Sequence, residues 1–97
     1  MTRVEFSPTA GDDLEDLVDV IARRNFRAAM EVRASIIAAV NALAATTPTL
    51  EGRAVTMQTG APCRRWFVHP AVIYYERQAD RLWVLRVYHH AREPIAR

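Results

Sequence analysis

The sequence predicts an α+β fold with the element order β-α-α-β-β-β-β, in which a two-helix hairpin packs on one face of a small antiparallel sheet. Two observations support this prediction. Apolar residues recur with a helical period between residues 8 and 48, whereas on both sides of this region they alternate or run continuously, as in strands. With 97 residues, 51% hydrophobic and 25% charged, the chain fits one compact domain, residues 1–97, and is too apolar to be disordered.

The first strand and the first helix are predicted between residues 3 and 24. Arg3–Phe6 alternates polar and apolar side chains, which is typical of a short half-buried strand. Ser7 is a strong helix N-cap, and Pro8 suits the first helical position because its missing N–H would have no partner there. One apolar stripe follows at helical spacing, at Leu14, Leu17, Val18 and Ile21. We therefore expect a helix over Pro8–Arg24.

A second helix is predicted to begin after Asn25, which can act as its cap, and to end at Thr46–Pro48. Its stripe comprises Ala29, Val32, Ile36, Val40 and Leu43. No Gly or Pro enforces a break between the two helical regions, so a single long helix is an alternative. The hairpin is favoured because a helix of that length would leave much of its apolar stripe without a partner in so small a domain.

Four strands are predicted after Pro48, separated by short turns that contain Gly, Pro or Asp. The predicted strands are Ala54–Gln58, Cys63–Val68, Val72–Arg77 and Leu82–His89. Because the connections are short, these strands should form an antiparallel meander. Leu82–His89 is apolar on both faces, which indicates a strand flanked on both sides in its sheet. The residues from His90 onward are polar.

Charge is nearly balanced overall but differs between the two halves of the chain. The formal net charge is +2, and all thirteen cations are arginine. Residues 1–48 hold five Arg and seven acids, whereas residues 49–97 hold eight Arg and four acids. So small a net charge does not indicate a nucleic-acid-binding footprint. The acids between residues 12 and 19 are expected to form a solvated helix face near the positive helix N-terminus.

The composition also predicts where the protein works. A single cysteine, Cys63, excludes an intramolecular disulfide and favours a reducing compartment. The first residues contain no apolar signal region, and no uninterrupted apolar run approaches the roughly 18 residues of a membrane span. We therefore expect a cytoplasmic protein that is not associated with a membrane.

Common catalytic and cofactor motifs are absent from the sequence. Glycine occurs only at positions 11, 52 and 60, so no glycine-rich phosphate loop is present. One cysteine and three histidines give no zinc spacing, and His89 and His90, as neighbours on a strand, should point to opposite faces. Cys63 is expected to be a small buried side chain rather than a nucleophile. We therefore expect neither a metal nor a cofactor.

The residues that remain as candidates for chemistry lie on the later strands. Strand alternation predicts that Leu82, Val84, Arg86 and Tyr88 share one face, with Arg86 and Tyr88 side by side on the surface that the helices leave uncovered. Arginines and a tyrosine there could cleave RNA without a metal, the tyrosine or a histidine taking the 2′-OH proton. Alternatively both are structural, with Arg86 paired to an acid such as Glu76 and Tyr88 packed under the C-terminal tail.

The order and spacing of several segments resemble the ParE/RelE superfamily of toxins from type II toxin–antitoxin systems, often called plasmid stabilisation proteins. The matching segments are Val4–Ala10, Arg64–Arg65, Val72–Glu76 and Leu85–Glu93. The resemblance implies the fold predicted above. It also implies that a cognate antitoxin neutralises the protein, with an acidic amphipathic segment of the antitoxin wrapping the helical hairpin and the sheet edge. On this interpretation Arg23, Arg24 and Arg27 are candidate antitoxin contacts, and the complex is a heterotetramer or larger.

The superfamily divides by target into gyrase inhibitors of the ParE branch and ribosome-dependent endoribonucleases of the RelE branch. Leu85–Glu93 resembles the ParE branch, although Tyr88 replaces the usual aliphatic residue and Glu93 the usual Asp. The ribonuclease members tend to carry lysines, which this chain lacks. Inhibition of DNA gyrase is therefore the leading hypothesis, with four candidate target contacts: Arg65, Arg86, His90 and Arg92. The alternative is a metal-independent nuclease acting on ribosome-bound mRNA through Arg64, Arg86, Tyr88 and His89. A third is an inert toxin-like domain.

Overall fold

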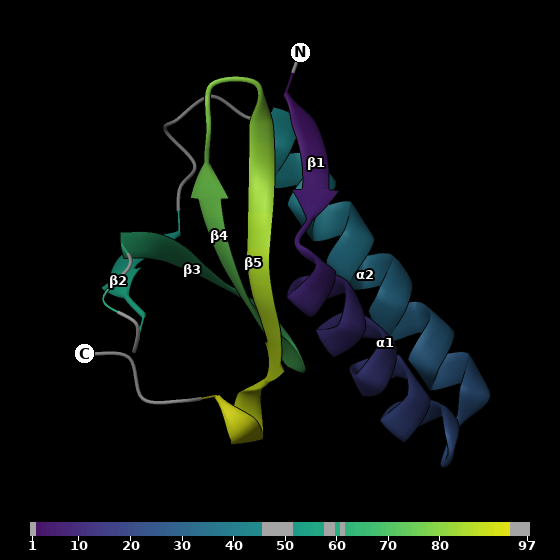
Figure 1. Ribbon diagram of the computed structural model, residues 1–97. Coiled ribbons are helices and arrows are strands. Elements are labelled where there is room, and N and C mark those ends of the chain that lie inside the picture. Colours follow the sequence, from purple (N-terminus) through teal and green to yellow (C-terminus); the bar gives the residue numbers. More distant parts are fainter. Residues whose placement is uncertain (1, 46–51, 58–59, 61, 94–97) are drawn as a thin grey trace.

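The computed structural model describes residues 2–45, 52–57, 60 and 62–93. Its elements follow the predicted order (Figure 1). They are β1 (Arg3–Phe6), α1 (Pro8–Ala22), α2 (Phe26–Ala45), β2 (Arg53–Thr56), β3 (Pro62–Val68), β4 (Ala71–Arg77), β5 (Arg81–His89) and the short 3₁₀ helix η1 (His90–Arg92). The predicted helix end at Thr46–Pro48 lies outside the described residues.

The two helices form a hairpin, as predicted, because polar side chains begin each helix. The Ser7 hydroxyl accepts a hydrogen bond from the backbone N–H of Ala10 at 2.9 Å, and the Asn25 amide oxygen accepts one from the N–H of Ala28 at 3.0 Å. Between the helices, the N–H groups of Arg24 and Asn25 both donate to the carbonyl of Ile21. This tightened last turn ends α1 without a glycine, two residues earlier than predicted.

The five strands form one mixed sheet in the order β1-β5-β4-β3-β2. The prediction of an all-antiparallel sheet is wrong, because β1 runs parallel to β5, with Val4 beside Leu82 and Phe6 beside Val84. Short turns force only the consecutive strands β2 to β5 to be antiparallel, whereas the helical hairpin joins β1 to the rest and leaves its direction free. As predicted, β5 is flanked on both sides, by β1 and β4.

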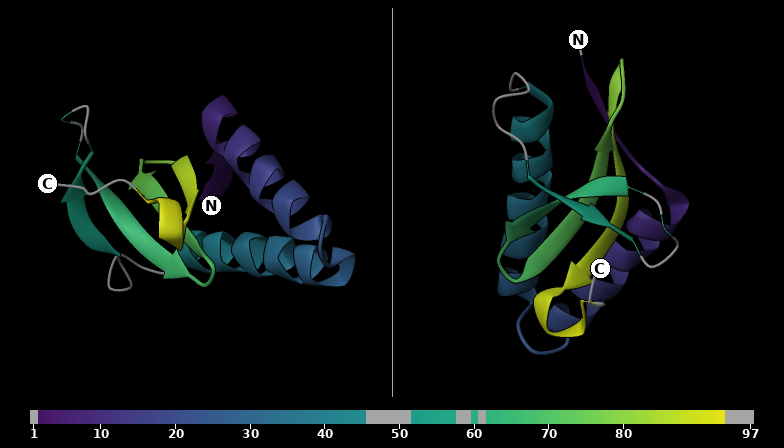
Figure 2. Two further views of the ribbon diagram at one scale, coloured as in Figure 1. Left: turned by 90° about the horizontal axis from the view of Figure 1, so that it is seen from below. Right: turned by 90° about the vertical axis from the view of Figure 1, so that its left-hand side faces the viewer.

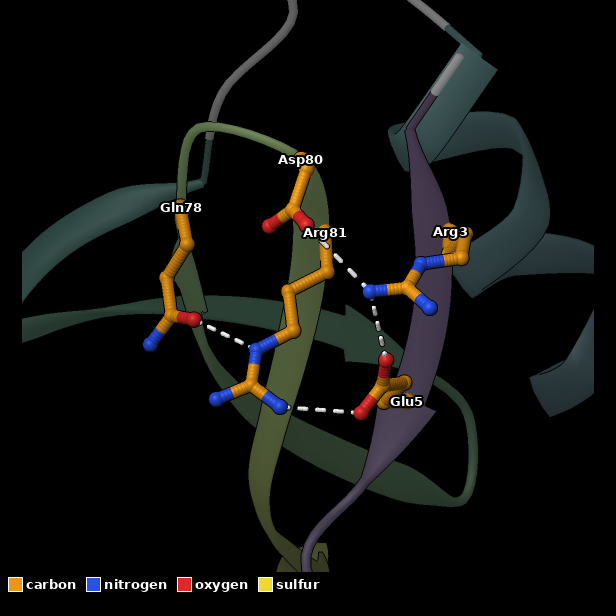
Figure 3. A network of polar contacts seen from close by, with 5 residues as sticks. All are labelled: Arg3, Glu5, Gln78, Asp80 and Arg81. Carbon is orange, nitrogen blue, oxygen red and sulfur yellow. Dashed lines mark hydrogen bonds and ion pairs between the residues drawn. The ribbon is translucent and has the colours of Figure 1, made fainter.

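A network of ion pairs stabilises the parallel pair of strands at the end where they begin (Figure 3). Arg81 of β5 reaches Glu5 of β1 at 2.8 Å, and Arg3 lies 3.2 Å from Glu5 and 3.3 Å from Asp80. Gln78 accepts a further hydrogen bond from Arg81. Since these side chains are exposed or half-buried, each pair contributes little energy, but together the pairs favour the register of β1.

Both helices cover the same face of the sheet (Figures 1 and 2). Their apolar stripes pack against alternate residues of β4 and β5 in one buried cluster, which includes Leu14, Ile36, Val40, Leu43, Ile73, Tyr75, Leu82 and Val84. Each fully buried side chain of this size contributes about 1.5–3 kcal/mol. A smaller buried cluster of Cys63, Val72 and Tyr74 lies on the other face of the sheet.

An irregularity in β5 changes which side chains face the helices. Tyr75 pairs with Val84 but Tyr74 pairs with Arg86, so Leu85 is an extra residue that forms a β-bulge. Leu82 and Val84 therefore lie in the core beneath the helices, whereas Tyr88 packs against the cluster on the opposite face. The prediction that these residues share one face is wrong, because a bulge reverses the alternation along the strand.

By length and composition alone, α2 is apolar enough to cross a membrane, with a mean hydropathy of 1.4. The prediction that no apolar run approaches the length of a membrane span is therefore wrong, because the few polar residues of α2 are spaced along the helix and leave it apolar on average. In the structure Ala29, Ile36, Val40 and Leu43 of α2 are completely or almost completely buried in the core. A core helix of a globular domain has the same composition, so this feature is weak evidence for a membrane span.

Candidate functional site

We call the face of the sheet that the two helices leave uncovered the open face. The candidate residues on it lie near the part of β5 that extends beyond β1. Because β1 ends at Phe6, the backbone of β5 after Val84 has no neighbouring strand on that side. The loop and the first turns of α1 take over its hydrogen bonds. The Ser7 hydroxyl donates to the carbonyl of Leu85 at 2.9 Å, and the Asp13 carboxylate accepts from the N–H of Val87 at 3.0 Å.

Asp13 also holds the guanidinium group of Arg86. Nε of Arg86 donates to Oδ2 of Asp13 at 2.7 Å, and Nη2 donates to Oδ1 at 3.2 Å. The hydrogen bond to Asp13 raises the pKa of Arg86 above its ordinary value. The expected pairing with a local acid such as Glu76 is wrong, since the partner comes from α1. As predicted, Arg86 and Tyr88 are neighbours, with the guanidinium carbon 4.7 Å from the centre of the tyrosine ring.

A second carboxylate, that of Glu93, ties the C-terminal segment to the open face. Arg65 donates to Glu93 from Nε at 2.5 Å and from Nη2 at 2.8 Å, and the hydroxyl of Tyr74 donates to the same carboxylate at 2.6 Å. The hydrogen bond from Arg65 lowers the pKa of Glu93. Burial, together with the hydrogen bond to Glu93, raises the pKa of Tyr74 to about 12. We call Arg65, Tyr74 and Glu93 the tail clamp.

Arg64, on the same strand as Arg65, has a backbone partner. Its Nη1 donates to the carbonyl of Gly52 at 3.1 Å, and the N–H of Gly52 donates to the hydroxyl oxygen of Tyr75 at 2.7 Å. A Cβ atom at position 52 would lie 2.3 Å from the carbonyl oxygen of Arg65, so only glycine fits. These contacts hold the chain entering β2 against β3, which is a structural role.

All three histidines of the chain gather with Phe67 near the start of η1. The ring centres of His89 and His90 are 4.7 Å apart, those of His69 and His90 are 5.4 Å apart, and Phe67 meets His90 edge-on. The prediction that His89 and His90 point to opposite faces is wrong, because β5 ends at His89. Nδ1 of His89 accepts a hydrogen bond from the N–H of Ala91 and so begins η1.

This histidine group leaves an exposed surface at the end of the sheet. Phe67 is 50% exposed, and His69, His90 and Arg92 are also exposed. We call Phe67, His69, His90 and Arg92 the terminal patch. Burial, together with charge interactions with His90 and Arg92, lowers the pKa of His89 below its ordinary value of 6.5, so the neutral ring predominates at pH 7. Within the described residues no group of histidines, cysteines and acids has the geometry to hold a metal ion.

A cavity of about 420 Å³ lies next to the terminal patch, between α1 and the end of β5. Its walls are Leu17, Val20, Val87 and Ala91, with acids of α1 on one side and Arg92 on the other. Val20 is 49% exposed although it lies on a helix that covers the sheet. The sequence patterns did not single out Phe67, His69 or Val20. They placed Asp13 among the solvated acids of the first helix, which is wrong for this residue, because its carboxylate is held by Arg86 and by the N–H of Val87. The proximity of these residues follows from the bulge and from the end of β5, which no local pattern predicts.

The candidate target contacts fall into two groups. Arg65 and Arg86 are held by carboxylates, whereas His90 and Arg92 are exposed beside the cavity. The candidate antitoxin contacts Arg23, Arg24 and Arg27 are exposed where the helical hairpin turns.

The candidate nuclease residues are only partly brought together. Arg86 and Tyr88 are in contact, and His89 follows them, but Arg64 lies on β3, separated from β5 by β4. Burial raises the pKa of Tyr88, so its hydroxyl is protonated at neutral pH. The open face is therefore an ion-pair network with an exposed patch at one end.

The structure defines a class of protein, a two-layer α+β domain with a helical hairpin on one face of the sheet, which is the fold that the resemblance implied. The chain matches the family described as ParE toxin of type II toxin-antitoxin system, parDE, over residues 4–94. It therefore belongs to the ParE toxin family. The predicted resemblance to ParE-type toxins is therefore confirmed.

A solved structure titled Chromosomal ParDE TA system from P. aeruginosa matches this fold with a TM-score of 0.76. The two chains share 16% sequence identity, and the match covers 92% of this chain and 96% of that one. At this identity the similarity supports the fold alone. A search of curated proteins finds no matching relative.

Proposed function

We propose that this toxin inhibits DNA gyrase in the cytoplasm and that a cognate antitoxin neutralises it. The observation that carries the proposal is that two of the four candidate target contacts are engaged in ion pairs and two are exposed. Arg65 and Arg86 are used to hold the protein together, whereas His90 and Arg92 are exposed next to Phe67 and a cavity. An exposed aromatic ring with nearby cations suits binding to another macromolecule, since aromatic and arginine side chains dominate such interfaces.

The ion pair that holds Arg86 weighs against the nuclease alternative. An arginine that stabilises a phosphorane must direct its N–H groups at the phosphate, but Arg86 directs two of them at Asp13. Tyr88 is a poor base because its pKa is raised. His89 has a suitable neutral ring, but Nδ1 already accepts a backbone hydrogen bond. A nuclease built on these residues would first have to break the contacts that order its own C-terminal segment.

The direct test is a supercoiling assay with purified toxin, purified gyrase and relaxed plasmid. We expect loss of supercoiling and accumulation of cleaved plasmid, both reduced at least tenfold by Arg92→Glu combined with His90→Ala. Arg33→Glu is a matched control because Arg33 is also exposed but lies on α2, away from the terminal patch. It should inhibit gyrase as the wild type does.

A parallel assay with ribosomes and mRNA decides between the two targets. If the toxin leaves gyrase active but cleaves ribosome-bound mRNA, the gyrase proposal fails and the nuclease alternative replaces it. If neither assay responds, the inert interpretation holds.

The proposed neutralisation needs a separate experiment in cells. Co-expression with its own antitoxin should restore growth. Glutamine substitutions at Arg23, Arg24 and Arg27, the proposed antitoxin contacts, should weaken that rescue without changing toxicity.

A further inference from the structure

The outer surface of the helical hairpin carries charges of both signs, separated by helix. On α1 the acids Asp12, Glu15, Asp16 and Asp19 are exposed. The turn and α2 present the exposed arginines Arg23, Arg24, Arg27 and Arg33, with Glu31 as the only acid in α2. Within the described part of the chain none of the four α1 acids or the four arginines makes a side-chain ion pair or hydrogen bond.

Four arginines of the sheet behave differently. Arg3, Arg65, Arg81 and Arg86 each have a carboxylate partner within 3.3 Å. These four arginines form ion pairs that stabilise the fold, whereas the exposed acids and arginines of the hairpin form none within the described residues. Charges left open in this way are available to a partner that carries the complementary pattern.

Exposed apolar side chains lie near the arginines of α2. Phe26 is 68% exposed and Met30 is 38% exposed. They are four residues apart, so they lie on one side of α2, together with Arg33. The turn of the hairpin projects beyond the sheet in Figure 1 and in the left view of Figure 2, and the residues of this surface are exposed.

We propose that this surface binds a second copy of the same chain, hairpin against hairpin, around a two-fold axis. A two-fold arrangement of antiparallel hairpins places the acidic α1 of each copy opposite the basic α2 of the other. Phe26 and Met30 of each copy then pack within the contact. An acidic partner such as the proposed antitoxin segment complements only the four arginines, and a basic partner complements only the four acids of α1. A second copy supplies both signs in the required order.

The size of the surface predicts a reversible dimer. With a rise of about 1.5 Å per residue, α1 is about 22 Å long and α2 about 30 Å long. Two such helices bury less than the roughly 800 Å² per partner of a stable complex. Association should therefore be concentration-dependent and weakened by salt, because the charges of the contact surface are exposed.

The arginines proposed as antitoxin contacts belong to this surface, so a bound antitoxin would exclude the second copy.

Sedimentation equilibrium of the purified full chain tests the proposal. We expect a monomer–dimer equilibrium between about 1 and 300 μM at low salt, and at least tenfold weaker association at about 0.5 M salt. Phe26→Glu should weaken the dimer at least tenfold. Phe67→Glu is the matched control, because Phe67 is exposed to a similar degree but lies on β3, and it should leave association unchanged.

A charge exchange makes the test specific for the proposed pairing. The variant Arg27→Glu/Arg33→Glu and the variant Asp16→Arg/Asp19→Arg should each fail to self-associate. Mixed in equal amounts they should form a heterodimer, since every contact between α1 and α2 again joins opposite charges. A wild-type chain that stays monomeric up to 300 μM would overturn the proposal. Association that is lost with Phe67→Glu but kept in both charge-reversal variants would overturn it as well.

Discussion

At the scale of single residues, Glu93 carries the attachment of the C-terminal segment. It receives three hydrogen bonds from Arg65 and Tyr74, and its side chain is 16% exposed. Glu93→Gln removes the charge that Arg65 needs, so we expect a loss of about 1–2 kcal/mol of unfolding free energy in urea denaturation. The pKa of Tyr74 should fall from about 12 toward 10 in an ultraviolet titration. Glu93→Asp keeps the charge and should lower the pKa less.

The tail clamp also sets the pH dependence of stability. The folded protein lowers the pKa of Glu93, so the unfolded chain binds its proton more readily. The stability that Glu93 contributes is present above the ordinary value of 4.5 and is lost as the pH falls through its folded pKa. Glu93→Gln should therefore flatten the acid limb of the stability curve. An acid limb that is as steep in this variant as in the wild type would contradict the assignment.

At the scale of elements, Asp13 replaces a missing strand at the exposed edge of β5. Asp13→Ala leaves both the N–H of Val87 and the guanidinium of Arg86 without their partner, so we expect a loss of about 1–3 kcal/mol. Hydrogen exchange at the Val87 amide should accelerate in parallel. The neighbouring Asp12 is exposed and makes no side-chain contact within the described chain. Asp12→Ala is thus the control and should change stability by less than about 0.5 kcal/mol; equal effects at both positions would contradict the role of Asp13.

The same scale explains which predictions from sequence succeeded. The caps Ser7 and Asn25 act within a few residues, so local patterns predicted the hairpin, and short turns predicted the meander of β2 to β5. The direction of β1 and the bulge at Leu85 depend on pairing between distant strands, which no local period encodes. For the candidate site, alternation predicted that Arg86 and Tyr88 are neighbours. It did not predict their carboxylate partner, which lies on α1.

At the scale of the whole molecule, the arginines that the structure describes include a structural group and an unpaired group. The protein measures 38 × 30 × 22 Å, and its helical hairpin extends away from the sheet. Arg65, Arg81 and Arg86 cross between elements that are far apart in the sequence and fix the sheet to its surroundings. The hairpin arginines make no such contacts within the described residues. A net charge of +2 therefore says less about this protein than the location of its ion pairs.

The difference between the unpaired and the structural arginines predicts different changes in melting temperature when their charges are removed. Replacing Arg23, Arg24, Arg27 and Arg33 together by Gln removes four charges but no contact within the described chain, so we expect the melting temperature of the dilute protein to change by less than about 3 °C. Arg65→Gln alone breaks the tail clamp and, with about 1–2 kcal/mol lost, should lower it by about 4–8 °C. Differential scanning calorimetry at about 5 μM, where the proposed dimer is largely dissociated, measures both. If the quadruple variant proves the less stable of the two, the hairpin arginines support the fold through contacts that this structure does not contain, and the division between structural and unpaired charges is wrong.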